Sequence, residues 1–109
     1  MADSTPQSFQ EMFSRLFAEN HAVMVQRQRK YGKHNIPRYG TYGTLVRMGD
    51  KFSRLENFMD PNGTGHSLNS ADESLEDTLI DIANYATIMR AQLRGWWTKE
   101  SCPDLLPEH

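Results

Sequence analysis

Apolar residues in the first part of the chain recur every three or four positions, which is the spacing of one face of a helix. They are Phe9, Met12, Phe13, Leu16, Phe17, Val23 and Met24. Ser8 stands just before them and Glu11 follows three residues later, in the arrangement of a capping box. The pattern predicts a helix from about Ser8 to Arg29.

A second apolar stripe predicts a helix from about Thr41 to Met59. Its members alternate between spacings of three and four residues, as on a face that packs against another helix. They are Leu45, Met48, Phe52, Leu55 and Met59. Between the two helices, residues 30–40 contain two glycines and a proline, so we expect a long loop there.

A third helix is expected from about Ala71 to Arg94, with Gly95 as its C-cap. The turn-rich residues 60–70 before it are expected to form a flexible loop. No segment shows the alternation of a half-buried strand. The predicted fold class is therefore all-α, a small bundle of three main helices.

The length of the chain, 109 residues, suits one domain over residues 1–109. We expect its core at about 8–95, a flexible N-terminus at 1–7 and a C-terminal tail at 96–109. The adjacent tryptophans of that tail are expected to pack on the bundle or on a second subunit. Because three helices of modest length bury a core thinly, we expect oligomerisation to complete the bundle.

Composition and charge narrow the class of protein. Hydrophobic residues make up 38% of the chain and the formal net charge is -2, so a broad basic surface is absent and nucleic acid is not the expected partner. The basic run from Arg27 to Arg38, with Tyr31 and Tyr39 interleaved, leaves a small nucleic-acid accessory role open. Cys102 is the single cysteine, which fits a reducing compartment. With no secretory pattern and no apolar run of membrane length, we expect a cytoplasmic protein without a membrane partner.

The third predicted helix carries an acidic stripe. Glu73, Asp77, Asp81 and Asn84 fall within an arc of roughly 80° on a helical wheel. Apolar neighbours such as Ile88 suggest that this face is partly covered. Covered carboxylates four residues apart repel one another unless a cation neutralises them, and oxygen-rich sites suit Mg²⁺ or Mn²⁺. A solvated acidic face remains the alternative.

The segment from Glu73 to Tyr85 resembles the third-helix motif of the MazG-like all-α nucleoside triphosphate pyrophosphatases. The wider pattern is most similar to the phage-associated nucleotide-modification-associated domain family. It includes Tyr31-Gly32, and the run from Leu45 to Lys51 followed by Arg54. The resemblance spans about residues 28–93.

The resemblance implies a helical fold, often a dimer or tetramer, that handles nucleotides with a divalent metal. Glu73 and Asp77 would be metal ligands and catalytic residues, and Asp81 lies on the right face to join them. Asn84 would contact the ligand or the metal shell. In the pyrophosphatases, activated water attacks between the α- and β-phosphates and releases pyrophosphate.

The second predicted helix departs from the pyrophosphatase pattern. Where those enzymes carry a second carboxylate pair, this chain has a mixture of charges. Asp50 would supply a further metal ligand, and Lys51 and Arg54 are suited to phosphate binding. Lys30 and Tyr31 would close over the base or the phosphates. The sequence thus predicts nucleotide binding and leaves hydrolysis open.

Two hypotheses from different classes follow. The first is a metal-dependent nucleotide-binding protein of phage nucleotide metabolism or DNA modification, in the host cytoplasm if phage-encoded. Its enzymatic form would hydrolyse a nucleoside triphosphate to the monophosphate and pyrophosphate. The second is a non-catalytic helical oligomer in which cations such as Lys51 and Arg54 pair with the acids of the third helix, and in which Trp96 and Trp97 lie at the interface.

Overall fold

The computed structural model describes residues 5–59 and 73–104. Three α-helices make up most of this part of the chain: α1 spans Phe9–Tyr31, α2 spans Gly40–Met59 and α3 spans Glu73–Leu93. A 3-10 turn, η1, spans Ile36–Tyr39. The described residues contain no strand, which confirms the all-α prediction for them. None of their helices is long and apolar enough to cross a membrane.

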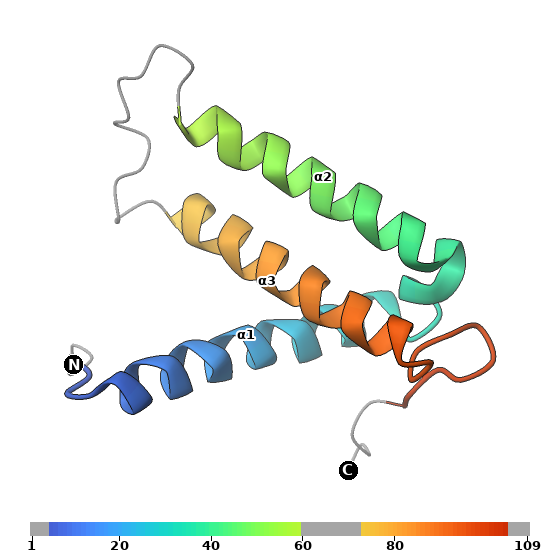
Figure 1. Ribbon diagram of the computed structural model, residues 1–109, viewed down its shortest axis with the longest axis horizontal. Helices are drawn as coiled ribbons and strands as arrows, with labels where there is room; N and C mark the ends of the chain where they lie inside the picture. The colour runs from blue at the N-terminus through green and yellow to red at the C-terminus, as the bar shows by residue number, and fades with distance from the viewer. Residues whose placement is uncertain (1–4, 60–72, 105–109) are drawn as a thin grey trace.

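The middle of the fold is α3. Helix α3 runs antiparallel to α2. The C-terminal half of α1 crosses beside the C-terminal half of α3 (Figure 1). The N-terminal half of α1 diverges from the other two helices (Figure 1). The radius of gyration is 16.2 Å, against about 13 Å for a compact domain of this length. The three helices therefore leave an open arrangement rather than a closed bundle.

The start of α1 follows the capping pattern of the sequence. The Ser8 hydroxyl accepts a hydrogen bond from the Glu11 backbone N–H at 3.1 Å. The Glu11 carboxylate in turn accepts from the backbone N–H of Gln7 at 2.7 Å. At the other end the helix continues to Tyr31, beyond the predicted Arg29, and stops at Gly32 because that residue has a φ of 83°.

The end of α3 is a Schellman motif centred on Gly95, as its predicted role as C-cap requires. Gly95 has a φ of 77°. Its N–H donates to the Gln92 carbonyl at 3.0 Å, and the Trp96 N–H donates to the Ala91 carbonyl at 2.9 Å. This turn sends the following residues back across the end of the bundle.

The returning tail supplies a core residue. Trp97 is buried and packs with Ile36 of η1 and Ile88 of α3. Its indole N–H donates to the Lys33 carbonyl at 2.9 Å. Trp96 is 61% exposed. The prediction that the tryptophans pack on the bundle or on a second subunit is therefore confirmed for Trp97, and for Trp96 the second subunit stays a prediction.

Two polar contacts hold the tail against the connection between α1 and η1. Lys33 Nζ forms an ion pair with Asp104 Oδ1, and Cys102 Sγ lies 3.5 Å from His34 Nδ1. The ammonium of Lys33 donates to the carboxylate and stabilises its charged form, so the pKa of Asp104 lies below its ordinary value. The same contact raises the pKa of Lys33.

The face of α2 that packs on α3 is only in part the apolar stripe predicted from the sequence, because Met48 and Leu55 of that stripe are half-buried. Leu45 and Phe52 of that stripe are about half exposed. Thr44 is instead 1% exposed, and its hydroxyl donates to the Gln92 side-chain oxygen at 2.8 Å. Polar contacts thus orient the helix, and the covered row is Thr44, Met48, Lys51 and Leu55.

The expected long loop at residues 30–40 is also wrong in part. Pro37 stands in the first turn of η1, where its missing N–H costs nothing, and both Ile36 and Pro37 are buried. The irregular connection is therefore short, at residues 32–35. The predicted loop at residues 60–70 lies outside the described residues.

Candidate functional site

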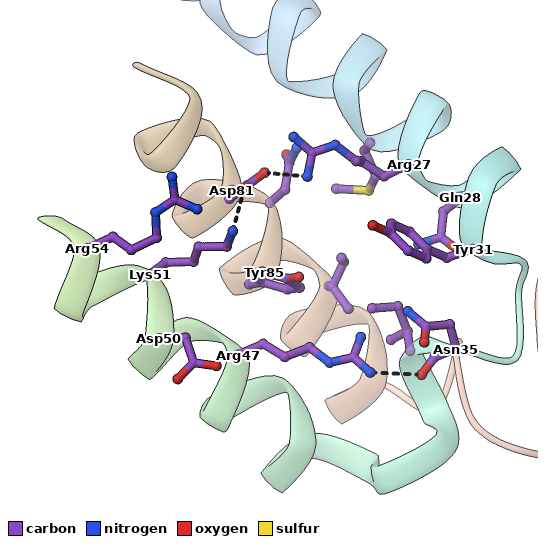
Figure 2. Close-up of a pocket in the computed structure, with 14 residues that line it drawn as sticks. Arg27, Gln28, Tyr31, Asn35, Arg47, Asp50, Lys51, Arg54, Asp81 and Tyr85 are labelled. Atoms are coloured by element: carbon purple, nitrogen blue, oxygen red, sulfur yellow. Dashed lines mark hydrogen bonds and ion pairs between the residues drawn. The ribbon is translucent and has the colours of Figure 1, made fainter. Parts of the chain in front are cut away.

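A pocket of about 490 Å³ opens between the three helices and η1. This volume lies within the range of small-molecule sites in proteins, roughly 300–1,000 Å³. Figure 2 shows side chains from every one of these elements directed toward it. Its lining consists of Met24, Arg27, Gln28, Tyr31, Asn35, Ile36, Arg47, Asp50, Lys51, Arg54, Asp81, Asn84, Tyr85 and Ile88.

One end of the pocket is charged. Asp81 of α3 is 8% exposed, and each of its carboxylate oxygens holds a cation. Arg27 Nη1 of α1 lies 3.1 Å from Oδ1, and Lys51 Nζ of α2 lies 3.0 Å from Oδ2 (Figure 2). One carboxylate therefore ties all three helices together at the pocket. For Lys51 this is the salt bridge to the third helix that the second hypothesis expects.

Two further pocket groups of α2 make no ion pair with any residue that the structure describes. Arg54 and Asp50 are both exposed at the wall (Figure 2). Arg47, between them and η1, donates to the Asn35 carbonyl at 3.3 Å. Four cationic side chains and two carboxylates line the pocket, so its wall is formally positive by two charges. Such a wall attracts anions.

The rest of the pocket is mainly apolar and aromatic, apart from Arg47 and Asn35 beside η1. Met24 and Tyr31 of α1, Ile36 of η1, and Tyr85 and Ile88 of α3 contribute to it. Ile36 and Ile88 belong to the buried core, so this part has a fixed wall. Tyr31 is 56% exposed and stands at the rim. A flat ring would find both a rigid apolar surface and aromatic side chains here.

Asn84 is the pocket residue whose role is most clearly structural. Its side-chain amide is buried and donates to the backbone carbonyl of Asn20 at 2.9 Å. This bond fastens α3 to α1 where the apolar stripe of α1 is interrupted. Asn84 lies at the predicted site, and its NH₂ group is already engaged.

The structure brings together some of the residues predicted for the site. Lys51, Arg54, Asp50, Asp81, Asn84 and Tyr31 all line the pocket. Lys30 is exposed outside the main pocket, with its ammonium 5.5 Å from the Tyr31 ring centroid. Asp77 is exposed and does not line the pocket. The side chain of Glu73 lies outside the described residues.

The predicted metal ligands do not form a cluster in the described part of the chain. No group of three His, Cys, Asp or Glu side chains there is placed to hold a metal ion. Both Asp81 oxygens face cations. Asp50 is the described carboxylate that lines the pocket without an ion pair. A metal that arrives with ligand phosphates needs only one or two carboxylates from the protein.

The sequence does not predict several pocket residues, and it identifies Arg27 only as part of the basic run from Arg27 to Arg38. Arg27 and Gln28 lie between Met24 and Tyr31 at spacings of three and four, so one helix row carries all four to the pocket. This row could have been found from the apolar stripe of α1. The sequence predicts that Arg47 lies off the packing face of α2, and only the true orientation of that helix brings it to the pocket.

Comparison of the chain with family models, curated proteins and solved structures gave no match. The resemblance to the MazG-like pyrophosphatases therefore stays a prediction from motifs. Any statement about function depends on the pocket itself.

Proposed function

We propose that this protein binds a nucleotide in the pocket between α1, α2 and α3. The observation that carries the proposal is that one pocket combines cationic side chains with an apolar, aromatic wall. A phosphate group matches the first and a base matches the second. A nucleotide is a ligand class that presents both within one small molecule.

The cationic end suits phosphate in particular. Arg54 offers a guanidinium with no described partner, and planar guanidinium groups bind phosphate oxygens through paired hydrogen bonds. Lys51 and Arg27 are held by Asp81, so they stand in place before a ligand arrives. Their fixed positions reduce the side-chain entropy lost on association, although Asp81 also competes with the phosphate for them.

A divalent metal fits the proposal as an ion bound jointly by the phosphates and the protein. Asp50 would be its protein ligand in the pocket, and Mg²⁺ or Mn²⁺ would offset phosphate charge there. Asp81 would hold and orient Arg27 and Lys51. Hydrolysis to the monophosphate and pyrophosphate is the enzymatic form of the proposal, and Asp77 and Glu73 remain its predicted carboxylates.

The test is a thermal-shift measurement on the full chain with Mg²⁺ or Mn²⁺, alone and with ATP, CTP, GTP, UTP and their diphosphates and monophosphates. We expect a rise in melting temperature that needs the nucleotide and grows with the number of phosphates. Pyrophosphate released in the same mixtures would establish hydrolysis. If no nucleotide stabilises the protein with either metal, nucleotide binding is rejected.

A second candidate function is assembly without catalysis, and one observation favours it. Five apolar side chains of the N-terminal half of α1 form an exposed row, each at least 37% exposed: Phe9, Met12, Phe13, Leu16 and Phe17. Contiguous exposed apolar faces mark protein interaction surfaces. The ion pairs of Asp81 with Arg27 and Lys51 would hold the three helices together in such an assembly, just as they would in a ligand-binding protein.

A further inference from the structure

Gln28 of α1 carries a buried acceptor with no donor. The residue is 8% exposed, and its side-chain oxygen, which is closed to solvent, has no hydrogen-bond partner among the described residues. Buried polar side-chain atoms without a partner are uncommon in folded proteins. An exception at the wall of a pocket points to a group that a ligand is meant to complete.

The position of Gln28 in the pocket indicates which part of a bound ligand would contact this side chain. Gln28 and Tyr31 are three residues apart on α1, so their side chains are neighbours on one helix face. Figure 2 shows Gln28 beside Tyr31, at the opposite end of the pocket from Lys51 and Arg54. A ligand whose phosphates lie against Arg54 therefore reaches Gln28 with its other end, the base.

We propose that Gln28 selects nucleotides whose base carries an amino group, as cytosine and adenine do, because its side-chain oxygen accepts a hydrogen bond from that group. This inference rests on the proposed nucleotide function. The oxygen is closed to solvent in the free protein, so an exocyclic amine pairs with it once the Gln28 side chain turns toward the pocket. A base with a carbonyl at the same position sets two oxygens against each other, which disfavours its binding in the same pose.

Gln28 is thus a specificity-determining residue. Sites built to hydrogen-bond a ligand discriminate strongly against analogues that lack the matching group, because the buried polar atom is left unpaired. Arg54 and Lys51 would bind the phosphates of every nucleotide equally. The preference among bases would come from the Gln28 end of the pocket alone.

The test compares two ligand pairs that differ in an amino group against a carbonyl: CTP with UTP, and ATP with inosine 5′-triphosphate. Calorimetric titration with Mn²⁺ would be carried out on the wild type, on Gln28→Met and on Gln26→Met. Methionine has nearly the same length as glutamine and no carbonyl. Gln26 is an exposed glutamine of the same helix outside the main pocket, so its substitution is the matched control.

We expect the wild type and Gln26→Met to bind the amino member of at least one pair about tenfold more tightly than the carbonyl member. In Gln28→Met that ratio should fall to about one. Inorganic tripolyphosphate, which has no base, should bind all three proteins equally and show that the variant is folded with its cationic end intact.

The outcomes separate the two proposals. Nucleotides that bind with equal affinity within both pairs, or a preference that survives in Gln28→Met, would overturn the role of Gln28 and leave the nucleotide function standing. Failure of every triphosphate to bind the wild type would overturn both.

Discussion

Lys51 Nζ of α2 lies 3.0 Å from Asp81 Oδ2 of α3, in a contact where the lysine side chain is 20% exposed and the aspartate side chain 10% exposed. The other Asp81 oxygen holds Arg27 of α1. Asp81 therefore acts as the internal counter-ion of the cationic pocket. A phosphate that enters the pocket competes with this carboxylate for the same two cations, so Asp81 sets both the stability of the free protein and its affinity for anions.

Replacing Asp81 by asparagine should separate these two roles. We expect Asp81→Asn to lower the free energy of unfolding by about 1–2 kcal/mol, which is less than for a fully buried pair because the Arg27 side chain is 42% exposed. Metal-free affinity for tripolyphosphate should rise about three- to tenfold, because one negative charge has left the pocket. Urea unfolding and calorimetry measure the two quantities.

Asp77→Asn is the matched control, the same substitution one turn earlier on α3 at an exposed position. It should change neither metal-free quantity. If Asp81 is instead a metal ligand, Asp81→Asn would abolish Mn²⁺-dependent stabilisation and leave metal-free tripolyphosphate binding unchanged.

Arg54 should contribute to binding and not to folding. It is exposed and without an ion pair among the described residues, so Arg54→Gln should change the free energy of unfolding by less than about 0.5 kcal/mol. Nucleotide affinity should fall about tenfold or more, because a charge-assisted contact to phosphate is lost. Arg90→Gln, at an α3 position outside the pocket, is the control. Equal losses in both variants would mean that only the overall charge matters.

The hydrogen bond between Thr44 and Gln92 should be a main polar contribution to the packing of α2 on α3. Thr44→Val keeps the shape and leaves the Gln92 oxygen without its 2.8 Å donor, so we expect a loss of about 1–3 kcal/mol in urea unfolding. The exposed Thr87 hydroxyl donates to the Ala83 carbonyl of its own helix. Thr87→Val should therefore cost less than about 0.5 kcal/mol, and a similar cost for both would contradict the assignment.

The sequence predicts where the helices lie along the chain, but it does not fully predict the faces on which they pack. Helix periods, the Ser8 cap and Gly95 depend on neighbouring residues, so local patterns predict them. The orientation of α2 depends on Thr44 meeting Gln92, residues 48 positions apart. No periodicity of apolar residues reveals such a pair, so the sequence favours the more apolar stripe.

The sequence predicts the charged residues of α2 and α3 at the candidate site, but not all of the ion pairs that they form. The acids of α3 and the cations of α2 were both found, and a salt bridge between the two helices was kept as an alternative to metal. The third partner, Arg27, belongs to α1, whose crossing point on α3 depends on tertiary packing. Gln28 gave no signal at all, because an unpaired buried acceptor exists only in the folded chain.

The exposed row on α1 should mediate self-association. Leu16 is 42% exposed at its centre, and a carboxylate there would have to be buried unpaired in any interface that covers the row. We expect sedimentation of the wild type to show a dimer or tetramer and Leu16→Asp to sediment as a monomer at the same concentration. Ser14 is exposed on the opposite side of α1, about 160° away on a helical wheel, so Ser14→Asp should assemble like the wild type. A wild-type protein that stays monomeric at high concentration would rule out assembly through α1.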